Sequence, residues 1–271
     1  MSTRLETLSR ITEAILCPPF AWCHVQRGQV TIGDASLYGG TRGGIVDVAS
    51  FAIAKYQVTN AQYQRFLDDP NGYAHLFWWE YSPEAIQWHK DHRKPKPTAF
   101  DGPVLPRTRV SWFDCMAFCA WLSSNLRNQT EKGNPGSVNM QNNDSWSVRL
   151  PTEQEWQRAA IGDMDWQYPW GNNLDVKRGN FGNSVGHPTQ VGSYPNGQSP
   201  CGAMDMLGNV WEWCLTPWGR EITDINGYTY RVFKGGAWNV SNPEHLRATD
   251  RYGHPPRGRL NDTGFRCVFM Y

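Results

Sequence analysis

Seven cysteines are the residues in this sequence with the widest chemistry, because thiolates bind soft metals and act as nucleophiles. Cys115 and Cys119 are four residues apart in the apolar run FDCMAFCAWL, so a helix would place both on one side. With a third ligand, such a pair could bind a metal. The same run is typical of a buried helix face, where free cysteine is common. The structural interpretation is the one we favour.

His89 and His92 form a second candidate, because two histidines three residues apart on one helix are close enough to bind the same metal ion, and Glu80 is close upstream. The surrounding run HKDHRKPKP is charged and typical of a solvated loop, which we favour over an iron site. The sequence has no phosphate-binding P-loop and no Cys-x-x-Cys pair.

Residues 233–269 contain a long segment with neither helical nor strand periodicity. It begins with the turn GGAW and ends with GFRCVF, and almost all of the residues between them are polar or small. Irregular segments of this length in a compact domain usually have a function. We therefore take this segment as the main candidate for the functional site.

The composition limits the class of protein that carries these residues. The 271 residues include 26 basic and 25 acidic side chains, which argues against a dedicated binder of nucleic acid or of anionic membranes. Fourteen Trp, 26 Gly and 18 Pro indicate a loop-rich fold held together by aromatic packing. No apolar run reaches the roughly 18 residues that span a bilayer. We expect a cytoplasmic protein with reduced thiols.

The elements that must position the long segment are predicted as follows. Residues 1–19 form an amphipathic helix, and residues 20–271 form one α+β domain with three to four helices and short antiparallel strands. Capping boxes at Thr59 and Thr152 mark two helix starts, and Ser111 caps a third helix. We expect irregular structure over 70–110, because of its prolines, and a mobile surface loop over 127–145.

Seven segments, in this order, resemble one family: YQVTNAQYQRFL, PRTRVSWFDCMAFCAWLS, RLPTEQEWQRAA, YPWGN, MDMLGNVWEWC, VFKGGAW and RATDRYGHPP followed by GFRCV. Together they look like the formylglycine-generating-enzyme or sulfatase-modifying-factor domain, a variant of the C-type lectin fold. The resemblance covers roughly residues 20–271. It implies the α+β, C-type-lectin-like architecture, but a fold hosts many functions.

The resemblance allows a check for the metal ligands that the oxidising enzymes of this family use. The copper enzymes of this family hold the metal with two cysteines that follow the Gly-Gly-Ser turn, and the matching segment GGAWNVSNPEHLRATDR has no cysteine. Cys214 and Cys267 are the nearest and do not match those positions. The ergothioneine-type branch adds a separate helical domain with iron-binding histidines, and no such array precedes the strands here. We expect neither copper nor iron.

The variable proteins of diversity-generating retroelements are the branch most similar in the long segment. Their fixed frame matches residues 235–238, 246–251, 256–259 and 264–266, with Trp238, Arg247, Arg251, Phe265 and Arg266 as scaffold. Positions between the frame residues, here called slots, would face a ligand. The slots are Asn239, Val240, Asp250, Tyr252, Gly253, His254, Gly258, Leu260, Asn261 and Asp262.

A structural calcium site is also implied by the resemblance. In the family, the Gly-Asn-x-Trp-Glu-Trp motif helps to bind calcium, which here implicates Asn209 and Glu212. A buried Glu212 paired with an arginine is an equally good interpretation.

The sequence thus predicts a non-catalytic binding protein of the retroelement variable type. Its ligand surface lies in residues 239–262, and it binds a protein or other macromolecular ligand but neither nucleic acid nor membrane. The alternative is a metal-dependent oxidase of the sulfatase-modifying-factor family, with copper or non-heme iron.

Overall fold

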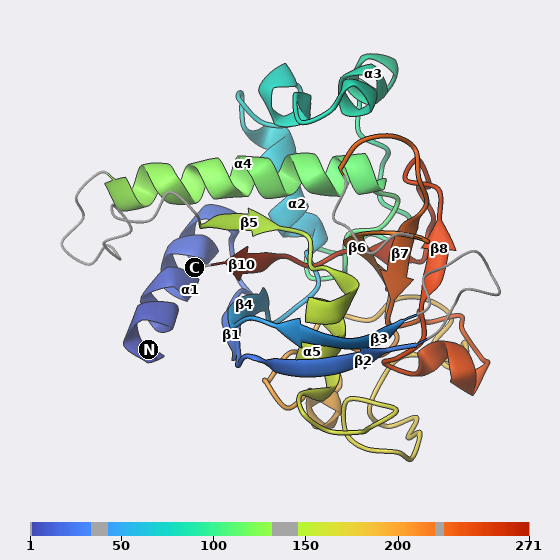
Figure 1. Cartoon of the computed structure of the whole chain (residues 1–271). Coiled ribbons are helices and arrows are strands. Elements are labelled where there is room, and N and C mark those ends of the chain that lie inside the picture. The colour runs from blue at the N-terminus through green and yellow to red at the C-terminus, as the bar shows by residue number, and fades with distance from the viewer. Residues whose placement is uncertain (1, 34–42, 132–145, 220–224, 271) are drawn as a thin grey trace.

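A four-stranded sheet joins both ends of the chain in the computed structural model, which describes residues 2–33, 43–131, 146–219 and 225–270 (Figure 1). The strands are β1 (Trp22–Val25), β4 (Phe51–Ala54), β10 (Val268–Met270) and β5 (Ser147–Arg149), in that order, and all neighbours are antiparallel. The C-terminal strand β10 therefore lies in the middle of this sheet. Its position holds the end of the long segment firmly in the core.

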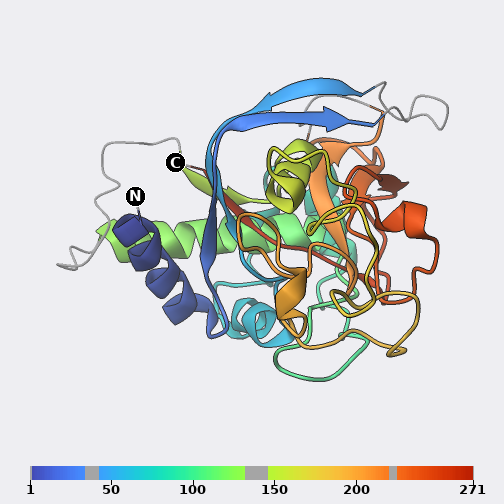
Figure 2. The same cartoon turned by 90° about the horizontal axis from the view of Figure 1, so that it is seen from below.

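A second four-stranded sheet carries the long segment itself. Its order is β8 (Tyr252–His254), β7 (Arg231–Lys234), β6 (Trp211–Pro217) and β9 (Thr263–Gly264). The pairs β8–β7 and β7–β6 are antiparallel, and β6–β9 is parallel. A separate ribbon of β2 (Gly28–Ile32) and β3 (Gly44–Val48) runs along α5, as Figure 2 shows. The short antiparallel strands were expected from the sequence.

Five α-helices surround the sheets in the described residues: α1 (Ser2–Leu16), α2 (Asn60–Asp68), α3 (Pro83–Asp91), α4 (Trp112–Glu131) and α5 (Glu153–Ile161). Three 3₁₀ turns, η2 (Leu76–Trp79), η3 (Pro195–Gly197) and η4 (Pro243–Leu246), lie in the connections. None of the helices described is both long and apolar enough to cross a bilayer.

Three predicted helix starts are confirmed. Thr59 and Thr152 each accept a hydrogen bond from the backbone three residues on and complete a capping box, at α2 and α5. Ser111 Oγ accepts from Asp114 N at the start of α4. That helix extends to Glu131, further than expected, and residues 132–145 of the predicted mobile loop lie outside the described residues.

The prediction of irregular structure over 70–110 is wrong for 83–91, which form α3. Pro83 occupies the first turn, where a missing N–H costs nothing, and Ser82 caps the helix by accepting from Ala85 N. The predicted solvated loop around the histidines is wrong for the same reason. His89 is buried and stacks on Trp79, with ring centroids 4.8 Å apart.

Aromatic side chains fill the core, as the composition predicted. Trp79, Trp112, Trp156 and Trp213 are all fully buried. Each removes roughly 150–250 Å² from water, worth about 4–6 kcal/mol before the entropy cost. Two indoles also fix backbone positions, because Trp112 Nε1 donates to Cys214 O and Trp213 Nε1 donates to Val110 O, both at 3.0 Å. These bonds tie the start of α4 to β6.

Candidate functional site

A buried ion pair, Arg266 with Glu212, anchors the end of the long segment. Arg266 Nε donates to Glu212 Oε2 and Nη2 donates to Oε1, both at 2.7 Å, and neither side chain is exposed by more than 1%. Trp156 Nε1 also donates to Oε2 and Gln57 Nε2 to Oε1. Burial by itself lowers the pKa of Arg266, but the Glu212 carboxylate outweighs it and the pKa lies above the ordinary value.

This geometry bears on the predicted calcium site. The arginine pairing, one of the two interpretations of Glu212, is present, and both carboxylate oxygens already accept two donors each. Asn209 Oδ1 accepts from Thr189 N at 2.9 Å, and its Nδ2 donates to Gln57 Oε1 at 3.0 Å. A calcium ion at these side chains stays a prediction, and it would have to displace some of these donors.

Two further arginines of the long segment form buried pairs. Arg251 Nη2 donates to Glu153 Oε1 at 2.6 Å, at the start of α5. Arg259 donates to both oxygens of Asp114 at 2.8 Å, at the start of α4. Burial alone would raise the pKa of Asp114, but Arg259 holds it below the ordinary value. Arg251 and Arg259 thus attach the long segment to the first turns of α5 and α4.

Arg247, predicted as a scaffold residue, pairs with an exposed carboxylate and not with a buried one. Its side chain is 40% exposed and lies 3.6 Å from the exposed Glu244, three residues earlier. Arg259, rather than Arg247, pairs with a buried carboxylate, that of Asp114. Residues 243–245 of η4 are exposed, and Arg247 lies just after this turn.

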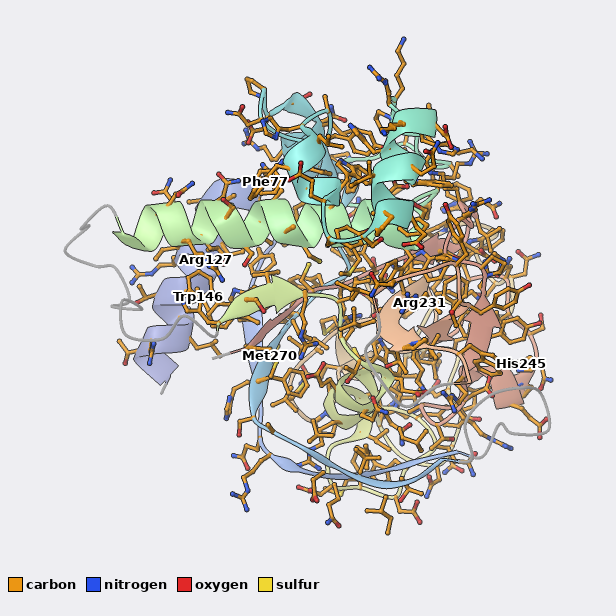
Figure 3. All side chains as sticks on the ribbon, turned by 45° about the horizontal axis from the view of Figure 1, so that its top comes forward. Phe77, Arg127, Trp146, Arg231, His245 and Met270 are labelled. Carbon is orange, nitrogen blue, oxygen red and sulfur yellow. The ribbon has the colours of Figure 1, made fainter. Side chains whose placement is uncertain are left out.

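The frame is more buried than the slots. The frame positions Gly235, Gly236, Leu246, Arg251, Pro256, Gly264, Phe265 and Arg266 are buried, whereas the frame residues Trp238, Arg247 and Arg259 are half-buried. None of the ten slots is buried. Asn239, Tyr252, Leu260 and Asn261 are exposed, and Val240, Asp250, Gly253, His254, Gly258 and Asp262 are half-buried. In Figure 3, His245, which precedes the frame residue Leu246, lies at the rim of the molecule, whereas Arg231 of β7 is buried.

Contacts join several slots into one continuous patch around Trp211. Asn239 Nδ2 donates to Asp262 Oδ2 at 3.0 Å, and Trp211 N donates to Asp262 O at 2.8 Å. The half-buried Trp211 ring lies 6.2 Å from the Tyr252 ring, which lies 6.3 Å from the His245 ring. His245 Nδ1 in turn is 3.1 Å from Asp250 Oδ2. We call these residues the Trp211 surface: Asn239, Trp211, His245, Asp250, Tyr252 and Asp262.

The remaining slots lie outside this patch. His254 stacks on Phe233, with ring centroids 5.2 Å apart, and Gly258 packs under the His254 ring. Leu260 O accepts from Arg109 N at 2.9 Å, which places Leu260 and Asn261 beside the chain that enters α4. Gly253 faces Trp218, where an added Cβ would lie 2.5 Å from the indole, and Val240 packs against a small apolar cluster.

Trp211 and His245 were not among the predicted site residues. Trp211 was assigned to the calcium motif together with Glu212. Side chains alternate along a strand, so two neighbours on β6 point to opposite faces. Glu212 faces the buried Arg266, and Trp211 therefore faces the slots. This alternation in WEW was the signal in the sequence that could have identified Trp211.

Cys115 and Cys119 pack in the interior, as favoured from the sequence. Cys115 and Cys119 are buried, and burial raises the pKa of both well above the ordinary value. Cys119 Sγ lies 3.6 Å from Cys267 Sγ across the α4–β10 contact. Within the described part of the chain, no three His, Cys, Asp or Glu side chains are grouped so as to hold a metal.

Comparisons with known proteins agree with this architecture. Residues 21–270 match the model of the sulfatase-modifying factor enzyme 1-like domain. The hercynine oxygenase of Mycobacterium tuberculosis is 32% identical over 248 residues, 80% of this chain and 52% of that protein. The mouse inactive C-alpha-formylglycine-generating enzyme 2 is 29% identical, over 82% of this chain and 76% of that protein. The chain thus spans about half the length of the hercynine oxygenase.

The fold itself is shared with a solved structure, the Treponema denticola variable protein 1. The TM-score is 0.64 at 20% identity, and the match covers 92% of this chain and 94% of that one. The C-type-lectin-like α+β fold predicted from the sequence is confirmed.

Proposed function

Because the chain belongs to the sulfatase-modifying factor enzyme 1-like domain family, we propose that it is a member that binds a ligand through the Trp211 surface rather than one that oxidises thiols. The observation that carries the proposal is that the arginines of the long segment and its slots differ in burial. Arg251, Arg259 and Arg266, here called the arginine frame, each pair with a buried carboxylate, whereas the slots are exposed or half-buried.

The chemistry of the surface supports this proposal. Trp211 and Tyr252 offer flat rings of low conformational entropy, and Asn239, Asp262 and the His245–Asp250 pair offer hydrogen bonds around them. Rigid aromatic side chains with adaptable polar neighbours are typical of recognition surfaces. A macromolecular partner fits such an open surface. Diversification of the slots is part of this proposal, and a reverse transcriptase gene and a template repeat beside the gene are its test.

Metal analysis and oxygen uptake test the non-catalytic part. The purified chain would be assayed for copper, iron and calcium by plasma mass spectrometry and in an oxygen electrode with cysteine and a cysteine peptide. We expect no stoichiometric copper or iron and no oxygen uptake above the blank. Stoichiometric copper or iron with thiol-dependent uptake would overturn the proposal.

Photo-crosslinking tests the surface. Benzoylphenylalanine at Tyr252 would be compared with the same residue at Met164, which is 48% exposed and lies at the end of α5, outside the Trp211 surface. We expect a discrete crosslinked partner at 252 and none at 164. Equal products at both positions would argue against a specific surface.

A second candidate is the substrate-holding half of a larger oxygenase. It is favoured by the identity to hercynine oxygenase and by the fact that this chain spans about half of that protein. In that case the metal ligands come from outside the described residues. Calorimetric titration with hercynine, using the parent chain and Trp211→Ala, tests it. Saturable binding that is lost in Trp211→Ala supports this candidate, and no heat of binding argues against it.

A further inference from the structure

A groove of about 550 Å³ lies between α1, α2 and α4, away from the Trp211 surface. Figure 1 shows α1 and β8 at opposite sides of the molecule. Ile11 and Ile15 of α1 and Trp121 of α4 supply the apolar lining. Its volume lies within the range of about 300–1,000 Å³ that is typical of small-molecule sites. The polar part of the lining is Thr7, Arg10, Arg65, Asp69, Asn125 and Gln129.

Trp121 gives the groove a fixed floor. Its ring is 3% exposed and packs against Phe66 and Phe118, at centroid distances of 5.4 and 5.6 Å. Its Nε1 donates to Asp69 Oδ2 at 2.7 Å, which locks the indole in orientation. A rigid ring reduces the entropy cost of binding an apolar group beside it.

Two arginines on different helices line the groove, Arg10 on α1 and Arg65 on α2. No carboxylate in the described part of the chain forms an ion pair with either guanidinium. Asp69, the acidic residue of the lining, is engaged by Trp121 Nε1 and by Asn71 N at 2.8 Å. The groove therefore has an excess of positive charge above an apolar floor.

We propose that this groove binds a small amphipathic organic anion, with a carboxylate held by Arg10 and Arg65 and an alkyl or aryl body lying on Ile11 and Ile15, beside the nearly buried Trp121. Guanidinium groups pair with carboxylates through two parallel hydrogen bonds, and these charge-assisted bonds are stronger than neutral ones. The apolar body adds burial in proportion to its area. Since α1 and α2 each supply one arginine, the ligand would also bridge the two helices. The inference is independent of the function proposed for the Trp211 surface.

Octanoate is the probe for this site, with acetate and octylammonium as comparisons, each titrated by calorimetry. We expect saturable binding of octanoate, at least tenfold weaker binding of acetate, which lacks the alkyl body, and of octylammonium, which carries the wrong charge. The double variant R10Q/R65Q should weaken octanoate binding at least about tenfold.

Arg4→Gln is the matched control, because Arg4 is an exposed arginine on the same helix that does not line the groove. It should leave octanoate binding unchanged, and circular dichroism should show all variants folded, since the three arginines are exposed. Absence of saturable octanoate binding overturns the proposal. So does binding that survives in R10Q/R65Q, or equal binding of octylammonium.

Discussion

The arginine frame and the Trp211 surface come from the same stretch of chain, yet they use polar side chains in opposite ways. In the frame, Arg251, Arg259 and Arg266 each meet a carboxylate that is at most 2% exposed. On the surface, Asn239–Asp262 and His245–Asp250 pair in contact with water. Breaking a buried pair leaves an uncompensated charge, whereas an exposed pair contributes little. The buried pairs therefore contribute most to stability, and the exposed pairs lie where the proposed ligand would bind.

The largest loss of stability should come from a substitution of the frame residue Arg266. In Arg266→Met, Glu212 keeps its buried carboxylate but loses the cation, so we expect a loss of about 3–5 kcal/mol in the free energy of unfolding. Urea denaturation measures it. The double variant R266M/E212Q removes the orphaned charge and should recover part of the loss. A cost under about 1 kcal/mol for Arg266→Met would contradict the frame.

The free energy of unfolding should depend on pH through Asp205, a buried carboxyl near the frame residue Arg266. Burial raises the pKa of Asp205 from 3.8 to about 6. Because the folded state binds the proton more tightly than the unfolded state, this group costs stability as the pH rises from about 4 through 6. The cost above pH 6 is on the order of 3 kcal/mol.

Asp205→Asn should remove this cost while leaving the uncharged side chain in place. Thermal melts at several pH values would compare the variant with the parent chain. The variant should gain stability relative to the parent above pH 6 and show no gain at pH 4. The same difference between the two chains at both pH values would show that the carboxyl does not titrate as described.

A calcium titration tests whether Glu212 only pairs with Arg266 or also binds a metal ion. A site at Asn209 and Glu212 predicts a rise in Tm with millimolar calcium, because a ligand that binds only the folded state stabilises it. The alternative interpretation, a Glu212 that only pairs with Arg266, predicts no rise, since both Glu212 oxygens already accept two donors. A thermal-shift titration measures it. A calcium-dependent rise that is lost in Glu212→Gln and is absent with magnesium would establish the metal site instead.

The smallest effect on stability should come from the slots. Asn239→Ala and Tyr252→Ala remove exposed side chains, so each should change the free energy of unfolding by about 0.5 kcal/mol or less. Urea denaturation compares them with Gly253→Ala, whose Cβ would lie 2.5 Å from the Trp218 ring. That slot should cost more, because the indole must move. A loss of several kcal/mol in Tyr252→Ala would place that residue in the frame.

The sequence predicted those features that depend on residues close together in the chain, such as helix starts. Capping boxes at Thr59 and Thr152 gave correct helix starts, and the pattern of Gly, Trp, Arg and Phe identified most of the frame. The helix α3 was missed because prolines were taken as breakers, although Pro83 at a first turn is compatible with a helix.

Contacts between distant segments were beyond prediction from one sequence. Arg259 meets Asp114 across 145 residues, and Trp211 meets Tyr252 only because β6, β7 and β8 pair in one register. The groove under α1 likewise depends on how three helices pack, which no local motif encodes. Residue types indicated the frame, but only the register of the strands shows which slots share a surface.

The most direct test of the division between frame and slots is a scan of every single substitution at residues 235–266, with protease resistance of the displayed chain as the readout. The account predicts tolerance at Asn239, Tyr252, Leu260, Asn261 and Asp262, and intolerance at Gly236, Arg251, Arg259, Phe265 and Arg266. Equal intolerance at both sets of positions, or tolerance at the buried arginines, would contradict it.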